Sequence, residues 1–215
     1  VGRGKVAIID PGPNLPEHID SLLEAVRGET VTDIVITHTH IDHSPATPPV
    51  KAATGAITWG FGPHGTPSGT YQVEEGADHD FVPDHAIGDG DVVSGDGWSL
   101  EAIHTPGHTS NHLCLALSEE NIMFSGDHVM GWSTSVISPP DGNMGDYLKS
   151  LRKLMVRDET RYWPTHGPAI ENPRPFVSAF IDHREKREVQ ILACLDEGLV
   201  TIPAMVEQLY TKVDP

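Results

Sequence analysis

The stretch richest in chemically active side chains is residues 36–44, ITHTHIDHS, which directly follows a β-branched run. Three imidazoles and a carboxylate on one short loop are costly to bury unless a cation organises them. His38 and His40 are two apart at the end of an extended run, so their side chains point the same way. Asp42 and His43 follow where the chain turns, and would face a neighbouring position. The spacing therefore predicts two adjoining metal sites rather than a solvated histidine-rich loop.

The same pattern recurs three more times, where a histidine or aspartate beside a glycine follows a strand-like run. These residues are His108, Asp127 and His166. Side chains at the carboxyl ends of strands converge on one edge of a sheet, where α/β proteins place their sites. We therefore expect a centre for two ions that share a water. Its two ligand sets would be His38, His40 and His108, and Asp42, His43 and His166, with Asp127 bridging them.

Bulk composition limits the classes of protein that this chain can be. It has 215 residues, of which 38% are hydrophobic and 21% charged, as in one globular domain rather than a disordered chain. No apolar run approaches the roughly 18 residues that cross a bilayer, and no signal-peptide pattern is visible. Cys114 and Cys194 lie among apolar neighbours, which favours buried free thiols and a cytoplasmic location.

The net charge of −17 indicates what the protein can bind. Two bound divalent cations would neutralise only a small part of it. A polyanion would be repelled at long range, so RNA is disfavoured as a partner without being excluded. A small-molecule substrate is the better expectation, and the sequence leaves the oligomeric state open.

Hydrophobic periodicity predicts an α/β architecture. Residues 6–9 and 31–36 read as strands joined by a helix at 16–27, which implies a parallel crossover. Residues 59–84 read as a long surface loop, with a flap over the site as one interpretation and with His64, His79 and His85 as solvated residues. The remaining predicted elements are antiparallel strands at 92–93, 98–103, 112–117 and 121–125, a strand at 160–163, and helices at 147–155, 174–197 and 201–212.

Three residues outside the ligand set have candidate supporting roles. Asp10 ends the first strand and is expected to orient ligand backbone or the second nitrogen of a histidine. His128 either lies near the second metal or makes a structural hydrogen bond. Trp132 could line a pocket. Pro48 and Pro49 predict that the helix after the histidine loop starts late, near Val50, or has a distorted first turn.

The ordered ligand set resembles the metallo-β-lactamase superfamily. Its H-x-H-x-D-H motif is here His38–His43, and its later single ligands match His108, Asp127 and His166. Within that superfamily the chain is similar to the branch around β-lactamase-like protein 2, through TPGHT at 105–109, SGDH at 125–128 and the HR-x-x-RE pattern at 183–188. Thr165 stands where that family is expected to have glycine.

The resemblance implies a four-layer αββα sandwich with a helical C-terminal appendage. It implies a catalytic domain at 1–172, with N-terminal strands missing, and an extension at 173–215 that is a shortened winged-helix-like unit. It also favours zinc over iron, because diiron flavoprotein relatives carry glutamate where His40 stands; iron or manganese is the alternative.

The function implied is a binuclear zinc hydrolase, in which a metal-bridging hydroxide attacks an ester, thioester, lactone or β-lactam carbonyl. Asp42 and Asp127 are the residues expected to take part in catalysis. One alternative is an endoribonuclease for single-stranded RNA, for which the basic residues at 183–188 argue mildly; the competing interpretation of that helix is ion pairing such as Arg184 with Glu188. Others are a mononuclear iron enzyme like persulfide dioxygenases and a metal-binding relative without catalysis.

Overall fold

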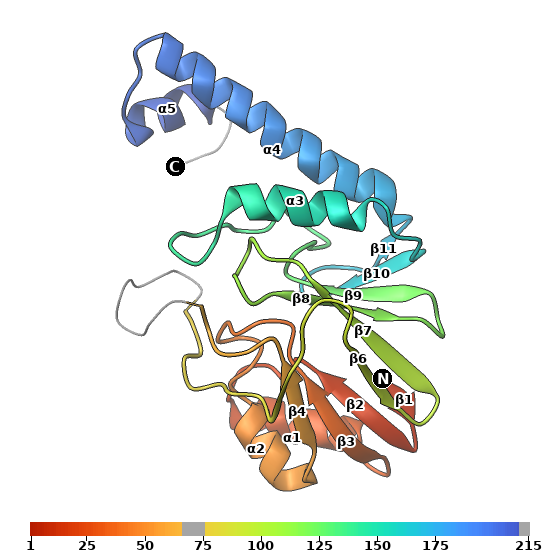
Figure 1. Ribbon diagram of the computed structural model, residues 1–215. Helices are drawn as coiled ribbons and strands as arrows, with labels where there is room; N and C mark the ends of the chain where they lie inside the picture. Colours follow the sequence, from red (N-terminus) through yellow and green to blue (C-terminus); the bar gives the residue numbers. More distant parts are fainter. Residues whose placement is uncertain (66–75, 211–215) are drawn as a thin grey trace.

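Two β-sheets lie between two groups of helices, and Figure 1 shows these four layers from α1 and α2 below to α3 and α4 above. The computed structural model describes residues 1–65 and 76–210. The predicted αββα sandwich is therefore confirmed. The C-terminal helices predicted beyond it are also present.

The first sheet is built mainly from parallel strands. Its order is β1-β2-β3-β4-β5, in which β1 is antiparallel to β2 and the other neighbours are parallel. The crossover predicted between the first two long strands is confirmed, since α1 joins β2 to β3. The bounds are β1 Gly2–Arg3, β2 Lys5–Ile9, α1 Pro16–Ala25, β3 Thr30–Val35, α2 Thr47–Thr54, β4 Ile57–Gly60 and β5 His85–Ala86.

The second sheet is mainly antiparallel, in the order β11-β10-β9-β8-β7-β6, with β10 parallel to β9. Strands β7, β9 and β10 therefore end at the same edge. The bounds are β6 Val92–Gly95, β7 Trp98–His104, β8 Leu113–Leu117, β9 Ile122–Gly126, α3 Met144–Leu154, β10 Arg161–Pro164, β11 Ile170–Glu171, α4 Pro173–Asp196 and α5 Ile202–Leu209.

Three apolar clusters fill the three spaces between the four layers. Alternation along β2 separates two of them, because Ile8 packs toward α1 and α2 while Ala7 faces the other sheet. The third cluster packs Met123 of the second sheet against Tyr147 of α3 and Phe180 of α4. Strand β8 is buried along its whole length because it contributes to the cores on both sides. This packing fixes the strand ends that carry the candidate ligands.

Several local predictions need correction. Helix α2 begins at Thr47 rather than near Val50, because Pro48 and Pro49 lie in its first turn, where backbone N–H groups have no partner within the helix. The predicted loop at 59–84 overlaps the end of β4. Residues 66–75, a part of the stretch 59–84 for which a flap was one interpretation, lie outside the described residues.

Two of the bulk predictions can be compared with the structure. Cys114 and Cys194 are both free thiols and both buried, as expected. Among residues 1–65 and 76–210, no helix combines the length and apolar character needed to cross a bilayer.

Candidate metal centre

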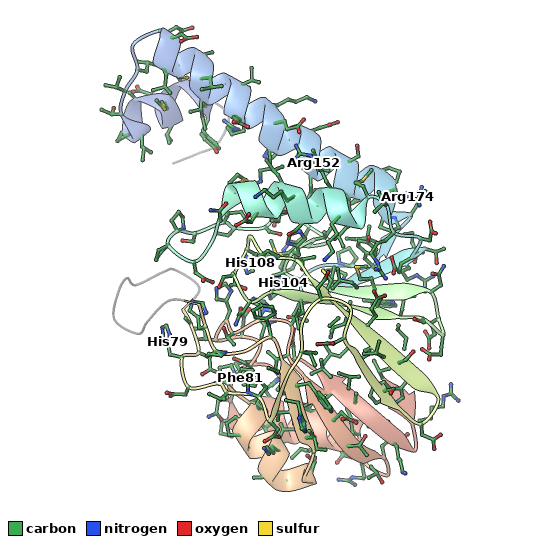
Figure 2. The ribbon with its side chains drawn as sticks, in the orientation of Figure 1. His79, Phe81, His104, His108, Arg152 and Arg174 are labelled. Atoms are coloured by element: carbon green, nitrogen blue, oxygen red, sulfur yellow. The ribbon has the colours of Figure 1, made fainter. Side chains whose placement is uncertain are left out.

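The candidate ligands come together at the edge where β3, β7, β9 and β10 end. His38, His40 and His108 form one group whose nitrogen atoms lie within 4.8 Å of one another. His40 Nδ1 lies 3.0 Å from His38 Nε2 and 3.1 Å from His108 Nε2. Figure 2 shows His108 beneath α3. Three imidazole nitrogens converging on one point is the donor set that zinc and similar cations prefer.

The second predicted group also assembles, nearer to solvent. His166 Nε2 lies 3.1 Å from Asp42 Oδ2, and His43 Nε2 lies 3.6 Å from Asp42 Oδ1. The side chain of His43 is fully buried, whereas those of His166 and Asp42 are 30% and 45% exposed. A ligand would therefore approach the centre from the side of His166 and Asp42.

Asp127 lies between the two groups, as predicted for a bridging residue. Its Oδ2 is 3.8 Å from His108 Nε2 in the first group, and 3.5 Å from His43 Nε2 and 3.4 Å from His166 Nε2 in the second. Its other oxygen, Oδ1, is buried without a hydrogen-bond partner, and so is His43 Nε2. Buried polar atoms are normally paired. These two atoms are therefore the ones expected to bind a cation, and the donor set fits one.

Neighbouring polar groups fix which nitrogen each histidine turns toward the centre. The Thr37 hydroxyl donates to Asp10 Oδ2 and therefore accepts from His38 Nδ1 at 3.0 Å. His108 Nδ1 donates to the Val136 carbonyl at 2.6 Å. Such contacts on the far nitrogen are characteristic of metal-binding histidines, because they fix the ring and its tautomer.

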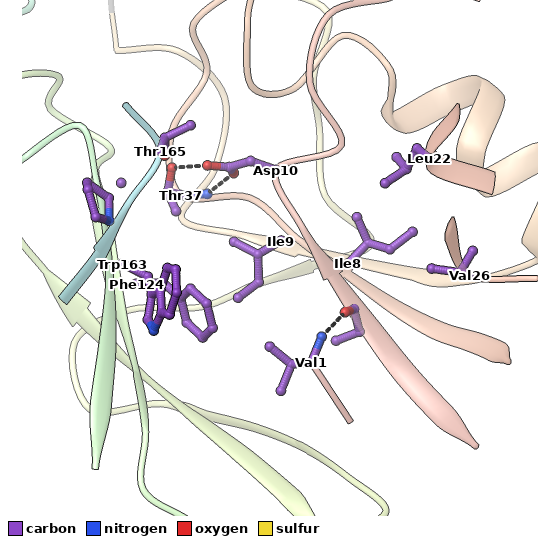
Figure 3. Close-up of a pocket in the computed structure, with 13 residues that line it drawn as sticks. Val1, Ile8, Ile9, Asp10, Leu22, Val26, Thr37, Phe124, Trp163 and Thr165 are labelled. Atoms are coloured by element: carbon purple, nitrogen blue, oxygen red, sulfur yellow. Dashed lines mark hydrogen bonds between the residues drawn. The ribbon is translucent and has the colours of Figure 1, made fainter. Parts of the chain in front are cut away.

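Asp10 has the supporting position that was predicted for it. Its carboxylate accepts from Thr37 N at 2.7 Å and from His43 Nδ1 at 3.0 Å. Figure 3 shows its hydrogen bonds with Thr37, and both residues line a cavity together with Ile9, Phe124 and Trp163. Asp10 has a φ of 46°, a left-handed conformation that aspartate tolerates better than most residues. One carboxylate thus positions both ends of the histidine loop.

Burial and charge make the histidine pKa values very different from one another. Burial, followed by repulsion from the neighbouring histidines, lowers the pKa of His40 to about 2 and that of His38 well below its usual value. Burial also acts on His43, but its hydrogen bond to Asp10 and the nearby Asp127 carboxylate, 3.5 Å from Nε2, outweigh burial and raise the pKa of His43 to about 10. Without a metal, His43 therefore holds a proton between two carboxylates.

Two supporting histidines were missed from sequence. His112 is fully buried and accepts from the Asp127 backbone N–H at 3.2 Å, while its Nδ1 lies 2.9 Å from the Thr105 hydroxyl. His64 was expected to be solvated, but its side chain is 3% exposed and Nδ1 lies 3.0 Å from the Thr39 hydroxyl. His112 begins an apolar run and His64 lies in a Gly-Pro-rich loop, so neither spacing signals the site.

The structural hydrogen bond that was one of the two roles predicted for His128 is not seen. Its ring is fully buried against Tyr147, with centroids 4.7 Å apart, and both of its nitrogens lack hydrogen-bond partners. Trp132 does stand at the site, where it is 69% exposed and stacks on His166 at a centroid distance of 5.9 Å. Ile41 and Val136 are also exposed beside ligand residues, so apolar side chains flank the centre.

Residues 1–166 match the family model of the metallo-beta-lactamase superfamily. The chain belongs to this superfamily. It is 36% identical over 216 residues to the beta-lactamase-like protein 2 homolog of Caenorhabditis elegans, covering 98% of this chain and 69% of the relative. It is 32% identical over 204 residues to an atrochrysone carboxyl ACP thioesterase of Emericella nidulans, covering 91% of this chain and 59% of that one.

Solved structures of the superfamily share the fold. A metallo-beta-lactamase family protein from Thermus thermophilus superposes with a TM-score of 0.74 at 22% identity, over 91% of this chain and 76% of its own. The protein TTHA1623, solved in a di-iron-bound form, gives 0.62 at 25% identity, over 78% of this chain and 85% of its own. The present chain spans about two thirds of the length of the curated relatives.

Proposed function

We propose that this metallo-beta-lactamase superfamily member is a binuclear metal hydrolase that cleaves a thioester or a related carbonyl ester. The observation that carries the proposal is the position of Asp127, with Oδ2 within 3.8 Å of histidines from both groups and Oδ1 buried without a partner. A bridging carboxylate between two sets of nitrogen donors suits two ions that share a water. The thioesterase relative supports the choice of carbonyl substrate.

His38, His40 and His108 would hold one ion and Asp42, His43 and His166 the other, with Asp127 touching both. When bound, such ions make water a nucleophile at neutral pH and polarise a carbonyl oxygen. The exposed Asp42 carboxylate lies at the open side, where it can orient that water and accept its proton. In the net reaction, water adds to the carbonyl carbon, the C–S bond breaks, and the leaving thiolate takes up a proton.

The walls of the site support an acyl substrate over a charged polymer. Trp132, Ile41 and Val136 expose apolar surface beside the ligands, which suits a hydrophobic acyl group. The net charge of −17 disfavours approach of a polyanion. Single-stranded RNA is therefore the competing substrate class, and the experiments below compare it with a thioester.

The first test is metal content per chain by plasma mass spectrometry. We expect about two zinc ions in the wild type and fewer in Asp127→Ala, since the bridge is lost. Asp33→Asn is the matched control, because Asp33 is a buried carboxylate that bonds Trp59 away from the ligand set. One iron per chain, or no metal, would overturn the binuclear zinc centre. Iron is measured alongside zinc because TTHA1623 was solved in a di-iron-bound form.

The second test is the substrate. A chromogenic acyl thioester should be hydrolysed by the wild type, and Asp127→Ala should lower kcat/KM by at least about 100-fold. A fluorescent single-stranded RNA should stay intact under the same conditions. Cleavage of the RNA with no turnover of thioester, ester, lactone or lactam would replace the proposed function with a nuclease.

A further inference from the structure

Among the residues that the structure describes, two arginines on α4 have no acidic partner, although the chain is strongly acidic. Arg184 and Arg187 are three residues apart, so they lie on the same side of the helix. The chain has 31 acidic and 14 basic residues, and nearby cations such as Arg152 are paired, in that case with Glu185. The ion pair predicted between Arg184 and Glu188 does not form. Within residues 1–65 and 76–210, neither Arg184 nor Arg187 makes a salt bridge.

Both guanidinium groups are held in place by aromatic rings instead. Arg184 lies over the Tyr147 ring of α3, 5.8 Å from its centre, and donates to the Ser135 carbonyl. Arg187 lies 4.2 Å over the ring of Tyr210, just after α5. Stacking occupies the face of a guanidinium and leaves N–H groups at its edge free to donate. The aromatic rings therefore hold the two guanidinium groups in place.

Each arginine also has a buried nitrogen without an acceptor. These atoms are Arg184 Nε and Arg187 Nη1. A buried N–H of a charged group that lacks an acceptor is costly, and natural proteins leave few such groups. An anion between the two side chains would supply the missing acceptors. The guanidinium fork matches the oxygens of phosphate in particular.

The overall charge limits what carries this phosphate. A polyanion would meet the repulsion of a −17 chain along its whole length. In a small molecule with a single phosphate, only that one group is repelled by the acidic chain. The same phosphate gains hydrogen bonds from two charged arginines. The arginine pair therefore favours a small phosphorylated group over a nucleic acid.

A single short loop joins this arginine pair to the metal centre. Trp132 stacks on His166, whereas Ser135 accepts from Arg184 and donates through its hydroxyl to the Asp127 carbonyl. The four residues from Trp132 to Ser135 span at most about 14 Å. A substrate extended beside this loop could therefore place one end at the ligands and the other at α4, where α3 and α4 also pack together (Figure 1).

We propose that Arg184 and Arg187 bind the phosphate on the carrier arm of an acyl thioester whose carbonyl is hydrolysed at the metal centre. This inference rests on the proposed function for the acyl group, but the phosphate site can be measured without any hydrolysis. It assigns the substrate to acyl groups on a phosphorylated thiol arm, whether that arm is free or attached to a carrier protein.

The binding test uses two compounds that differ only in the phosphate, 4′-phosphopantetheine and pantetheine. Calorimetry on the metal-loaded chain should show about 10- to 100-fold tighter binding of the phosphorylated compound. Arg187→Gln should abolish that preference. Lys186→Gln is the matched control, because it removes the same charge from the residue directly before Arg187. Lys186 lies on the surface of α4 with Asp182 and Val189. Equal binding of both compounds by the wild type, or an unchanged preference in Arg187→Gln, would overturn the proposal.

The kinetic test compares acyl-phosphopantetheine with acyl-pantetheine. The ratio of their kcat/KM values should exceed about 10 in the wild type and in Lys186→Gln, and fall toward 1 in Arg187→Gln. If neither thioester is hydrolysed, the proposed function fails while calorimetry still decides the phosphate site. If Arg187→Gln weakens binding of a single-stranded RNA without changing the preference for phosphopantetheine, the thioester assignment is wrong and a nucleic acid takes its place. Acyl-coenzyme A and an acylated carrier protein then distinguish a free arm from an attached one.

Discussion

At the scale of single residues, Asp10 shows how a side chain behind the candidate ligands can control the centre. Its carboxylate accepts from both Thr37 and His43, so its charge holds the His43 ring with Nε2 toward Asp127. Asp10→Asn keeps the shape but removes the charge. We expect it to lower metal affinity about 10- to 100-fold, because partners behind ligand histidines commonly have that effect. Competition with a chromophoric chelator measures it.

Asp84→Asn is the control for that experiment. Asp84 bonds the Thr58 hydroxyl and Lys51 away from the ligands, so its loss should leave metal affinity unchanged. Equal affinities for wild type and Asp10→Asn would show that the histidine loop is rigid without the charge of Asp10.

His128 is the second residue with a prediction of its own. Its ring is buried with both nitrogens unpaired, and burial, with repulsion from His108 second, lowers its pKa to about 3. His128→Phe retains a flat ring beside Tyr147 and removes two unsatisfied polar atoms. We expect the free energy of unfolding at pH 7.5 to rise by about 1–3 kcal/mol, as measured by urea denaturation. A loss of stability together with loss of metal would instead assign His128 to the centre.

At the scale of secondary-structure elements, the contact between α3 and the His108 loop leaves no room for a side chain at Gly107. Gly107 has a φ of 143°, and a Cβ there would overlap the backbone of Tyr147. The Asn143 N–H also donates to the Gly107 carbonyl at 2.8 Å. Gly107→Ala must therefore displace either α3 or His108. We expect it to cost more than about 3 kcal/mol and to reduce metal content, as seen by urea denaturation and plasma mass spectrometry.

Gly55→Ala separates steric overlap from backbone strain. Gly55 ends α2 with a φ of 73°, but a Cβ there meets no atom within 4 Å. Only the left-handed strain remains, at about 1–2 kcal/mol, and metal content should not change. If the two variants lose equal stability and both keep their metal, the helix contact does not position His108.

The accuracy of sequence-based prediction also differs between elements. The strands before Asp10 and the histidine loop were predicted because their apolar runs are continuous, as buried parallel strands require. Helix α2 was misplaced because proline was judged by its effect in a helix interior, whereas Pro48 and Pro49 lie in the first turn. His64 was misjudged because its burial depends on Thr39 and Asp141, which lie far from it in sequence.

The gathering of the ligands illustrates the same limit. Strand order cannot be read from local periodicity, so the rule that strand ends converge gave only the edge at which the ligands meet. The arrangement of the sheets and helices in four layers was predicted from the family resemblance and not from the periodicity. The partners of Arg184 could not be predicted either, because they are Ser135 and Tyr147 rather than the helical neighbour Glu188.

At the scale of the whole molecule, the cluster of buried histidines makes the metal-free protein sensitive to acid. Burial is the main cause that lowers the pKa values of seven histidines among residues 1–65 and 76–210, and five of these are buried residues. These five are His38, His40, His108, His112 and His128. In the unfolded chain, histidine takes up a proton near pH 6.5. Below that pH the unfolded state binds more protons, so the free energy of unfolding falls as pH falls.

His43 contributes in the opposite direction. Its pKa is raised to about 10, so its contribution to stability is fully present below about pH 6.5 and is lost as pH rises through 10. The contribution of His43 alone to the pH dependence cannot offset those of the five buried histidines. Each histidine kept neutral by burial contributes a slope of about 1.4 kcal/mol per pH unit below its unfolded pKa. The metal-free protein should therefore unfold cooperatively between about pH 6.5 and 5, above the range in which carboxylates titrate.

Bound metal should move this acid transition to lower pH, because protons must then displace a cation from the ligand histidines. Circular dichroism against pH, with and without a chelator, measures both transitions. His128→Phe should shift the metal-free transition to lower pH because one proton fewer is taken up on unfolding. His85→Gln changes an exposed histidine and should leave the transition where it is. A metal-free transition that occurs only below about pH 4 would show that carboxylates rather than buried histidines limit stability in acid, since that is where carboxylates titrate.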